Sequence, residues 1–163
     1  MTQNSVLNTQ PLNSSEVLPE LVKEVLSKGV ECRFQAKGHS MSPFIKNGDI
    51  LTIAPSRNNS PSVGDVVAFI QPENEKLIIH RVVKKRNNDY YVKGDNGLET
   101  DGLIYSTNIL GVVKKVERGG KKVRISLGLE RFLIALLTRT NLLPPVLRLV
   151  WRIFRPIARI FFP

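Results

Sequence analysis

The spacing of hydrophobic and polar positions changes three times along the chain, and these changes define its four segments. Residues 1–14 are polar and predict a flexible tail. Residues 15–29 place apolar side chains at helical spacing and end at Gly29, which predicts a short amphipathic helix. We expect the apolar face of this helix to pack on the main domain.

Residues 30–126 show the pattern of a β domain. Short runs of β-branched residues alternate with turns rich in Asn, Gly and Asp. The runs are residues 50–53, 66–70, 77–83, 90–92 and 110–116. Several short strands at this spacing are typical of an antiparallel barrel or sandwich, so the predicted fold class is mainly β.

From residue 127 the pattern becomes helical and predicts a basic amphipathic segment over residues 127–163. An apolar stretch at residues 127–137 is followed by a break and by a second helix at residues 146–162. Four arginines of the second helix recur at helical intervals, which places them on one stripe opposite an apolar face. These are Arg148, Arg152, Arg155 and Arg159.

Charge adds a prediction about partners. The 163-residue chain carries a formal net charge of +10, which suggests nucleic acid or an anionic membrane. Half of this charge lies in residues 129–163, which hold six arginines and one acidic residue. The β domain has few aromatic residues arranged among basic ones, as binding of single strands would need, so we do not expect nucleic acid as a partner. We expect the arginine stripe to bind an anionic membrane surface.

Composition excludes several other classes. A hydrophobic fraction of 42% is high enough for a packed core. With one cysteine and two histidines, the sequence predicts neither an intramolecular disulfide nor a Cys- or His-rich metal site. The N-terminus lacks the basic and apolar regions of a secretory signal, and no stretch of about 18 apolar residues predicts a transmembrane helix. We therefore expect a cytoplasmic protein.

Candidate chemistry lies in three short stretches, each of which has an ordinary explanation. Residues 38–43 (GHSMSP) predict a turn that exposes the Ser40 hydroxyl. His80 lies in an apolar run, where a lone histidine is usually a core residue. Asp95 and Asp101 lie in or after a turn of Gly, Asp and Asn. Taken together, they supply a nucleophile that needs a base, an imidazole that can take its proton, and a carboxylate that can orient the imidazole.

These stretches resemble the type I signal peptidase family, and within it the archaeal and endoplasmic-reticulum branch. The resemblance covers about residues 37–116, roughly half the chain, with the sequence boxes of the family in the same order. In the third box this branch has a histidine where the bacterial enzymes have a lysine. The matching stretches are residues 40–43 with 48–49, 63–69, 79–82, and 93–96 with Asp101.

The resemblance implies a signal-peptidase-like fold and a serine endopeptidase that cleaves a leader or precursor peptide bound as an extended strand. It implies Ser40 as the nucleophile, His80 as the general base and Asp101 as the residue that orients His80. Asp95 is the competing carboxylate for that third role. No metal and no cofactor are implied. We expect Arg81 to be a structural partner of Asp95 or of another turn carboxylate.

Two positions near the nucleophile depart from the family pattern. Many members have a serine two residues before the nucleophile, where its hydroxyl helps to hold the oxyanion, and this chain has Gly38. The backbone N–H of Ser40 can still donate to an oxyanion. His39 stands where some members have a small residue, and we expect it to face solvent.

The termini also depart from the family pattern. Signal peptidases carry an N-terminal membrane anchor, whereas this chain has a polar tail and a short helix there. We expect the C-terminal segment to lie in the headgroup region and the enzyme to be peripheral on the inner face of the membrane. In the alternative, the C-terminal helices fold onto the β domain or onto a partner.

Two other functions fit parts of the sequence. A self-cleaving regulatory domain like those of the SOS repressors shares the fold and the serine nucleophile. Those domains use a lysine base, and residues 77–83 offer none. A non-catalytic module that binds membranes or nucleic acid would account for the charge.

Overall fold

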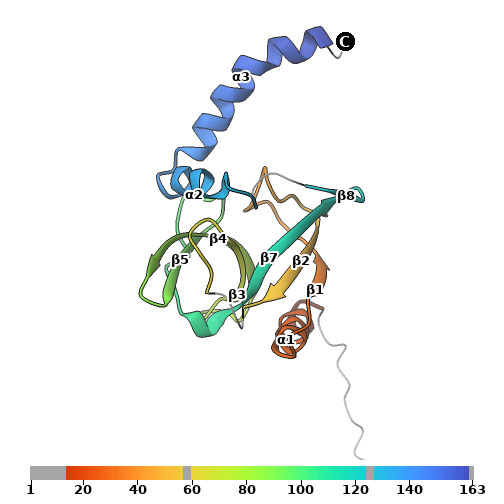
Figure 1. The fold of residues 1–163 in the computed structure, drawn as a ribbon, viewed down its shortest axis with the longest axis vertical. Helices are drawn as coiled ribbons and strands as arrows, with labels where there is room; N and C mark the ends of the chain where they lie inside the picture. The colour runs from red at the N-terminus through yellow and green to blue at the C-terminus, as the bar shows by residue number, and fades with distance from the viewer. Residues whose placement is uncertain (1–13, 57–59, 124–126, 162–163) are drawn as a thin grey trace, which may run out of the picture.

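The fold is a curled antiparallel β sheet with helices at both ends of the chain, as the computed structural model shows (Figure 1). The structure describes residues 14–56, 60–123 and 127–161, and it describes side chains in residues 18–56, 60–123 and 127–152. In chain order the elements are α1 (Ser14–Ser27), β1 (Cys32–Gln35), β2 (Ile50–Pro55), β3 (Val66–Ile70), β4 (Leu77–Arg86), β5 (Asp89–Lys93), β6 (Leu103–Ile104), the 3₁₀ turn η1 (Ser106–Asn108), β7 (Ile109–Arg118), β8 (Lys121–Lys122), α2 (Arg131–Arg139) and α3 (Leu143–Phe161). Of residues 1–14, for which we expect a flexible tail, residues 1–13 lie outside the described residues, and Ser14 is the first residue of α1.

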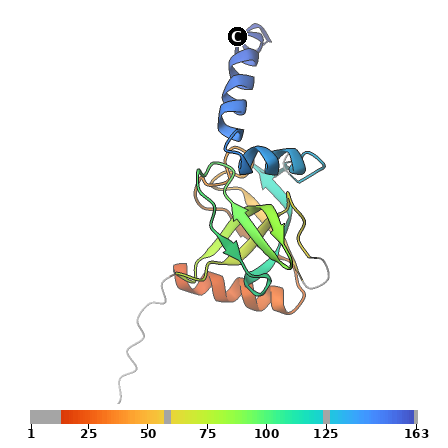
Figure 2. The same cartoon turned by 90° about the vertical axis from the view of Figure 1, so that its left-hand side faces the viewer.

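The eight strands form one sheet in the order β1-β2-β7-β3-β4-β5-β6, with β8 paired to β7. Every pair is antiparallel, and the sheet curls into a half-barrel (Figures 1 and 2). The predicted fold class, mainly β with an N-terminal helix and C-terminal helices, is confirmed. The five predicted β runs coincide with β2, β3, β4, β5 and β7, whereas the pattern does not predict β1, β6 and β8.

β3 is buried on both faces, which accounts for its uninterrupted apolar sequence. Val66 and Ala68 belong to the core beneath α1, whereas Val67 and Phe69 belong to a second core that includes Tyr90. Alternate side chains of β3 therefore pack into two different hydrophobic cores, one on each face of the sheet. This arrangement fixes the neighbouring β4, which carries His80, between β3 and β5.

The two C-terminal helices differ in their packing. α2 packs on β4 with Ile134, Ala135 and Thr138 buried, whereas α3 projects away from the sheet in both views (Figures 1 and 2). Of the two C-terminal helices, α2 thus lies against the β domain, and α3 extends from it.

α3 begins at Leu143, earlier than the expected residue 146, because Pro144 and Pro145 occupy its first turn. A proline is tolerated there, since the first N–H groups of a helix have no partner within the helix. The side chains of Arg155 and Arg159 lie outside the described residues. Within the described part of the chain no single helix has the length and apolar character of a membrane span. α2 and the first part of α3 reach that length and apolar character only when they are taken together, and a bend of 114° separates them.

Candidate active site

Ser40 lies in the loop between β1 and β2, and its side chain is exposed. Its neighbour Met41 is 4% exposed and packs in the core beneath α1, together with Ile45. These buried side chains anchor the loop while Ser40 remains at the surface. The loop therefore has the exposed serine that the turn sequence predicts.

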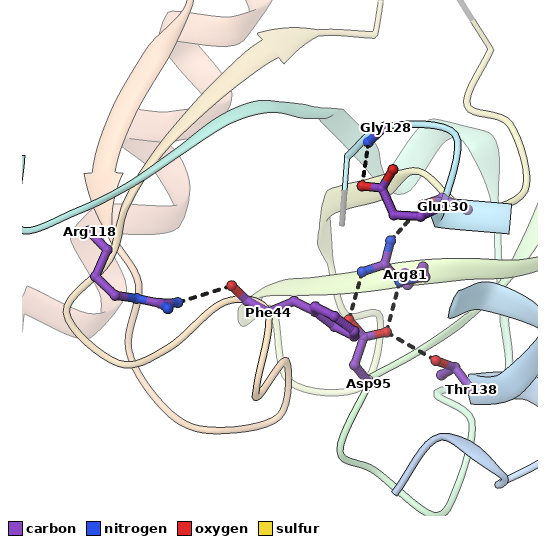
Figure 3. A network of polar contacts seen from close by, with 8 residues as sticks. Phe44, Arg81, Asp95, Arg118, Gly128, Glu130 and Thr138 are labelled. Atoms are coloured by element: carbon purple, nitrogen blue, oxygen red, sulfur yellow. Dashed lines mark hydrogen bonds and ion pairs between the residues drawn. The ribbon is translucent and has the colours of Figure 1, made fainter. Parts of the chain in front are cut away.

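The far end of the Ser40 loop is held by an ion pair between Asp49 and Arg118. Nε and Nη2 of Arg118 donate to the two carboxylate oxygens of Asp49 at 2.8 and 2.7 Å, and Nη2 also donates to the carbonyl of Phe44 at 3.1 Å (Figure 3). Hydrogen bonding to Arg118 holds the pKa of the buried Asp49 carboxyl below its ordinary value. The sequence motifs do not identify Arg118, because it lies 69 residues from Asp49 and meets it only through the pairing of β2 with β7.

His80 projects from β4 and is paired to Asp101. Its side chain is 14% exposed, and Nδ1 lies 2.5 Å from Oδ2 of Asp101. Asp101 reaches the ring because its N–H donates to the carbonyl of Val92 at 3.0 Å, which turns the loop after β5 back toward the sheet. The Nε2 atom is therefore the ring nitrogen that faces the Ser40 loop.

Gly94 is the point at which Ser40 and His80 meet. A Cβ atom at this position would lie 3.0 Å from Nε2 of His80, 3.2 Å from Cβ of Ser40 and 2.8 Å from the carbonyl oxygen of Ser40. The N–H of Asn96 donates to that same carbonyl at 2.8 Å, which ties the serine loop to the loop after β5. The described residues show no hydrogen bond between Ser40 Oγ and His80, and such pairs are often loose in the absence of substrate.

Asp95 has a different environment from Asp101. Both of its oxygens accept hydrogen bonds from Arg81, at 2.8 and 2.7 Å, and Oδ1 also accepts one from Thr138 at 3.2 Å (Figure 3). Both side chains of the Arg81–Asp95 pair are fully buried. Since Arg81 and His80 are adjacent on a strand, they face opposite sides of β4. The structure thus brings Ser40, His80 and Asp101 together and places Asp95 with Arg81, as expected for Arg81.

Lys93 is a buried lysine close to this site in the sequence. Burial lowers its pKa, as is often seen for a lysine that acts as a base. However, it lies opposite Arg81 in the register of β4 and β5 and therefore shares the face of Arg81. Its amino group donates to Oδ1 of Asn141, between α2 and α3. Lys93 is thus directed away from Ser40, and its geometry gives no support to a lysine base.

A cavity of about 700 Å³ opens beside Ser40 and His80. Its walls come from β1 with the Ser40 loop, from the first half of β4, and from the first turns of α1. They include Leu18, Pro19, Glu20, Phe34, Gln35, Ser40, Met41, Leu77, Ile78, Ile79 and His80. Among the described strands, β1 pairs only with β2, and residues 77–80 pair only with β3. Two unpaired strand edges therefore border the cavity.

The two residues before Ser40, Gly38 and His39, complete the turn that carries it. Gly38 has a φ of +93°, a left-handed conformation that favours glycine over serine. Its N–H donates to Oδ1 of Asn47 at 3.1 Å, which closes the loop. His39 is exposed, as expected. Gly38 therefore has a backbone role that a serine would fill less well.

Known proteins share this sequence over the region that carries the site. The catalytic subunit SEC11 of the signal peptidase complex from Saccharomyces cerevisiae strain YJM789 is 34% identical over 83 residues, which cover 48% of this chain and 49% of that protein. The same subunit from strains RM11-1a and JAY291 has the same identity and coverage. This chain spans about half the length of the curated relatives it matches.

The family match is broader. The sequence profile described as Peptidase S24-like matches residues 11–114, which include α1, most of the sheet and every candidate site residue. The resemblance to signal peptidases that the motifs indicate is confirmed at the level of this superfamily. The chain belongs to the peptidase S24-like family.

Proposed function

We propose that this protein is a serine endopeptidase that cleaves a leader or precursor peptide through an acyl-enzyme on Ser40. One observation carries the proposal. Gly94 lies against both Ser40 and Nε2 of His80, while Asp101 is paired with the other ring nitrogen. A serine hydroxyl needs a neighbouring base, and this arrangement offers one whose orientation is fixed.

The roles follow from these positions. His80 Nε2 takes the Ser40 proton as Oγ attacks the scissile carbonyl, and Nδ1–H donates to Asp101, which stabilises the imidazolium. The imidazolium then returns the proton to the leaving amine, so that the peptide C–N bond breaks. A water molecule next attacks the ester, with His80 again as base, and releases the acid and Ser40. The Ser40 N–H is the oxyanion donor that we propose, since Gly38 supplies no hydroxyl.

The cavity supports an extended peptide as substrate. β1 and residues 77–80 of β4 border it with unpaired edges, to which a peptide backbone can add as a strand. Its walls are largely apolar near Phe34, Leu77 and Ile79, which favours apolar substrate side chains beside the scissile bond. Ser40 and His80 lie at the wall, so a bound strand would pass both.

Cleavage of a peptide library by the full chain tests this function. Mass spectrometry of the products should show a defined cleavage motif with wild type and no cleavage with Ser40→Ala or His80→Ala. Ser42→Ala is the matched control, because it makes the same change two residues away in the same loop. Retained cleavage by Ser40→Ala would refute the role of Ser40. Shortening of the purified chain alone, without cleavage of added peptides, would instead support the self-cleaving domain.

We place this activity in the cytoplasm, on the inner face of the membrane. The cytoplasmic leaflet carries anionic lipid, and the C-terminal segment of this chain carries arginines without lysines. Fractionation of cells that express the full chain tests the location: the protein should sediment with membranes at low salt and be released by high salt. Recovery in the soluble fraction at all salt concentrations would contradict it.

A further inference from the structure

α3 exposes large apolar side chains next to arginines. Leu149, Val150 and Trp151 are 57, 45 and 66% exposed, and Arg148 and Arg152 on either side of them are exposed as well. We call these five residues the α3 surface. Because α3 projects away from the sheet, the β domain does not cover them (Figure 2). Isolated exposed apolar residues are common, but Leu149, Val150 and Trp151 together fill the side of the projecting helix opposite Arg148 and Arg152. An exposed apolar face of this breadth indicates a binding surface.

α2, which joins α3 to the β domain, also exposes large apolar side chains. Phe132, Leu133 and Leu136 are exposed on the outer side of α2, while Ile134 and Ala135 are buried against the sheet. α2 is therefore a fixed element with one face on the domain and the other free. Any surface that binds α3 will hold the peptidase domain through α2.

Charge identifies the kind of surface. α3 contains four arginines and no aspartate or glutamate. Nucleic acid would engage the arginines but leave Leu149, Val150 and Trp151 in water. The headgroup region of an anionic bilayer accepts both kinds of side chain, with apolar groups among the acyl chains and guanidinium groups at the lipid phosphates.

We propose that the α3 surface binds an anionic lipid bilayer, with Trp151 in the headgroup region and Arg148 and Arg152 at lipid phosphates. This interaction does not depend on peptidase activity. It assigns to α3 a function that neither the cavity nor the candidate catalytic residues involve.

Trp151 makes the test direct, because it is the only tryptophan of the chain. The full chain is titrated with phosphatidylcholine vesicles that contain about one third phosphatidylglycerol, and with pure phosphatidylcholine vesicles. Tryptophan emission should shift to shorter wavelength, and the protein should sediment, with the anionic vesicles only. In R148Q/R152Q the affinity should fall about 30-fold, since each arginine near an anionic surface contributes a factor of about five.

K84Q/K85Q is the matched control, because it removes the same charge from exposed positions on β4 and should bind like wild type. Equal weakening of both double variants would show that net charge alone is responsible and would overturn the proposal. No emission shift with anionic vesicles would also overturn it, as would salt-sensitive retention on DNA without vesicle binding. Because no peptide is cleaved in this experiment, its failure is distinct from failure of the proposed peptidase activity.

Discussion

Arg81 and Asp95 form a fully buried ion pair on the side of β4 opposite His80. The two aspartates of the last sequence box therefore have different partners: Asp95 is paired with the buried guanidinium of Arg81, and Asp101 with the imidazole of His80. Stability and activity should respond to them separately, which allows the two roles to be measured.

Alanine at each aspartate gives the first prediction. Asp95→Ala should lower the free energy of unfolding by about 3–5 kcal/mol, because it removes the carboxylate that accepts two hydrogen bonds from the buried Arg81. Asp101→Ala should leave most of the stability intact and lower kcat by about 10²- to 10⁴-fold. Urea unfolding and peptide cleavage measure the two effects. Full activity of Asp101→Ala would contradict its role in orienting His80.

Gly94 gives the second prediction. In Gly94→Ala the new methyl group would lie 2.8 Å from the carbonyl oxygen of Ser40, so the serine loop must move. A displacement of about 1 Å at a reacting group can lower the rate by about 10²-fold. Gly97→Ala is the control, because its nearest contact is 3.4 Å. Similar kcat/KM values for the two variants would show that close packing at Gly94 is not required.

The sequence pattern predicts the strands that are stabilised by burial of their own side chains, and it does not predict the strands that depend on pairing with a neighbour. β3 is a continuous apolar run because it is buried, and the first seven residues of β4 are mostly Leu, Ile and Val, so the pattern predicts both strands. β1 is an edge strand with exposed Arg33 and Gln35, and β6 has two residues. Such short or half-polar strands form through pairing with a neighbour, which the local sequence does not reveal.

The site shows the same limit. The motifs identify Ser40 and His80, but Asp95 and Asp101 occupy one loop and have similar sequence surroundings. They are distinguished only in the folded chain, where the hydrogen bond from Asp101 N–H to the carbonyl of Val92 turns Asp101, and not Asp95, toward His80. Thr138 could not be identified at all, because it lies 43 residues from Asp95 and reaches it only when α2 packs on β4.

Thr138 gives the third prediction, as a positioning residue. Its hydroxyl donates to Asp95, whose neighbour Gly94 lies against Ser40 and His80. Thr138→Val should lower kcat about fivefold, the equivalent of one hydrogen bond, with little change in KM. Thr138→Ser keeps the hydroxyl and should restore kcat. If serine fails to restore it while both variants unfold at the same urea concentration, the hydrogen bond is not the cause.

Asp49 gives the fourth prediction, on pH. Because Arg118 lowers the pKa of Asp49 in the folded state, the carboxylate stabilises the fold above its unfolded pKa of about 3.9. This stabilisation is lost as the pH falls through the lower, folded-state pKa. Asp49→Asn should therefore be less stable than wild type at pH 7 and should lose less stability on acidification. Glu24→Gln, at an exposed ion pair, is the control and should follow wild type closely. Parallel acid unfolding curves for wild type and Asp49→Asn would contradict this account.

The role of Ser40 as the nucleophile of a peptidase is measured by kcat/KM of Ser40→Ala and Ser42→Ala for the peptide that wild type cleaves fastest. We predict that Ser40→Ala loses about 10³-fold or more, while Ser42→Ala remains within a few-fold of wild type. Cleavage by Ser40→Ala at the wild-type rate, with a correctly folded protein, would contradict this role.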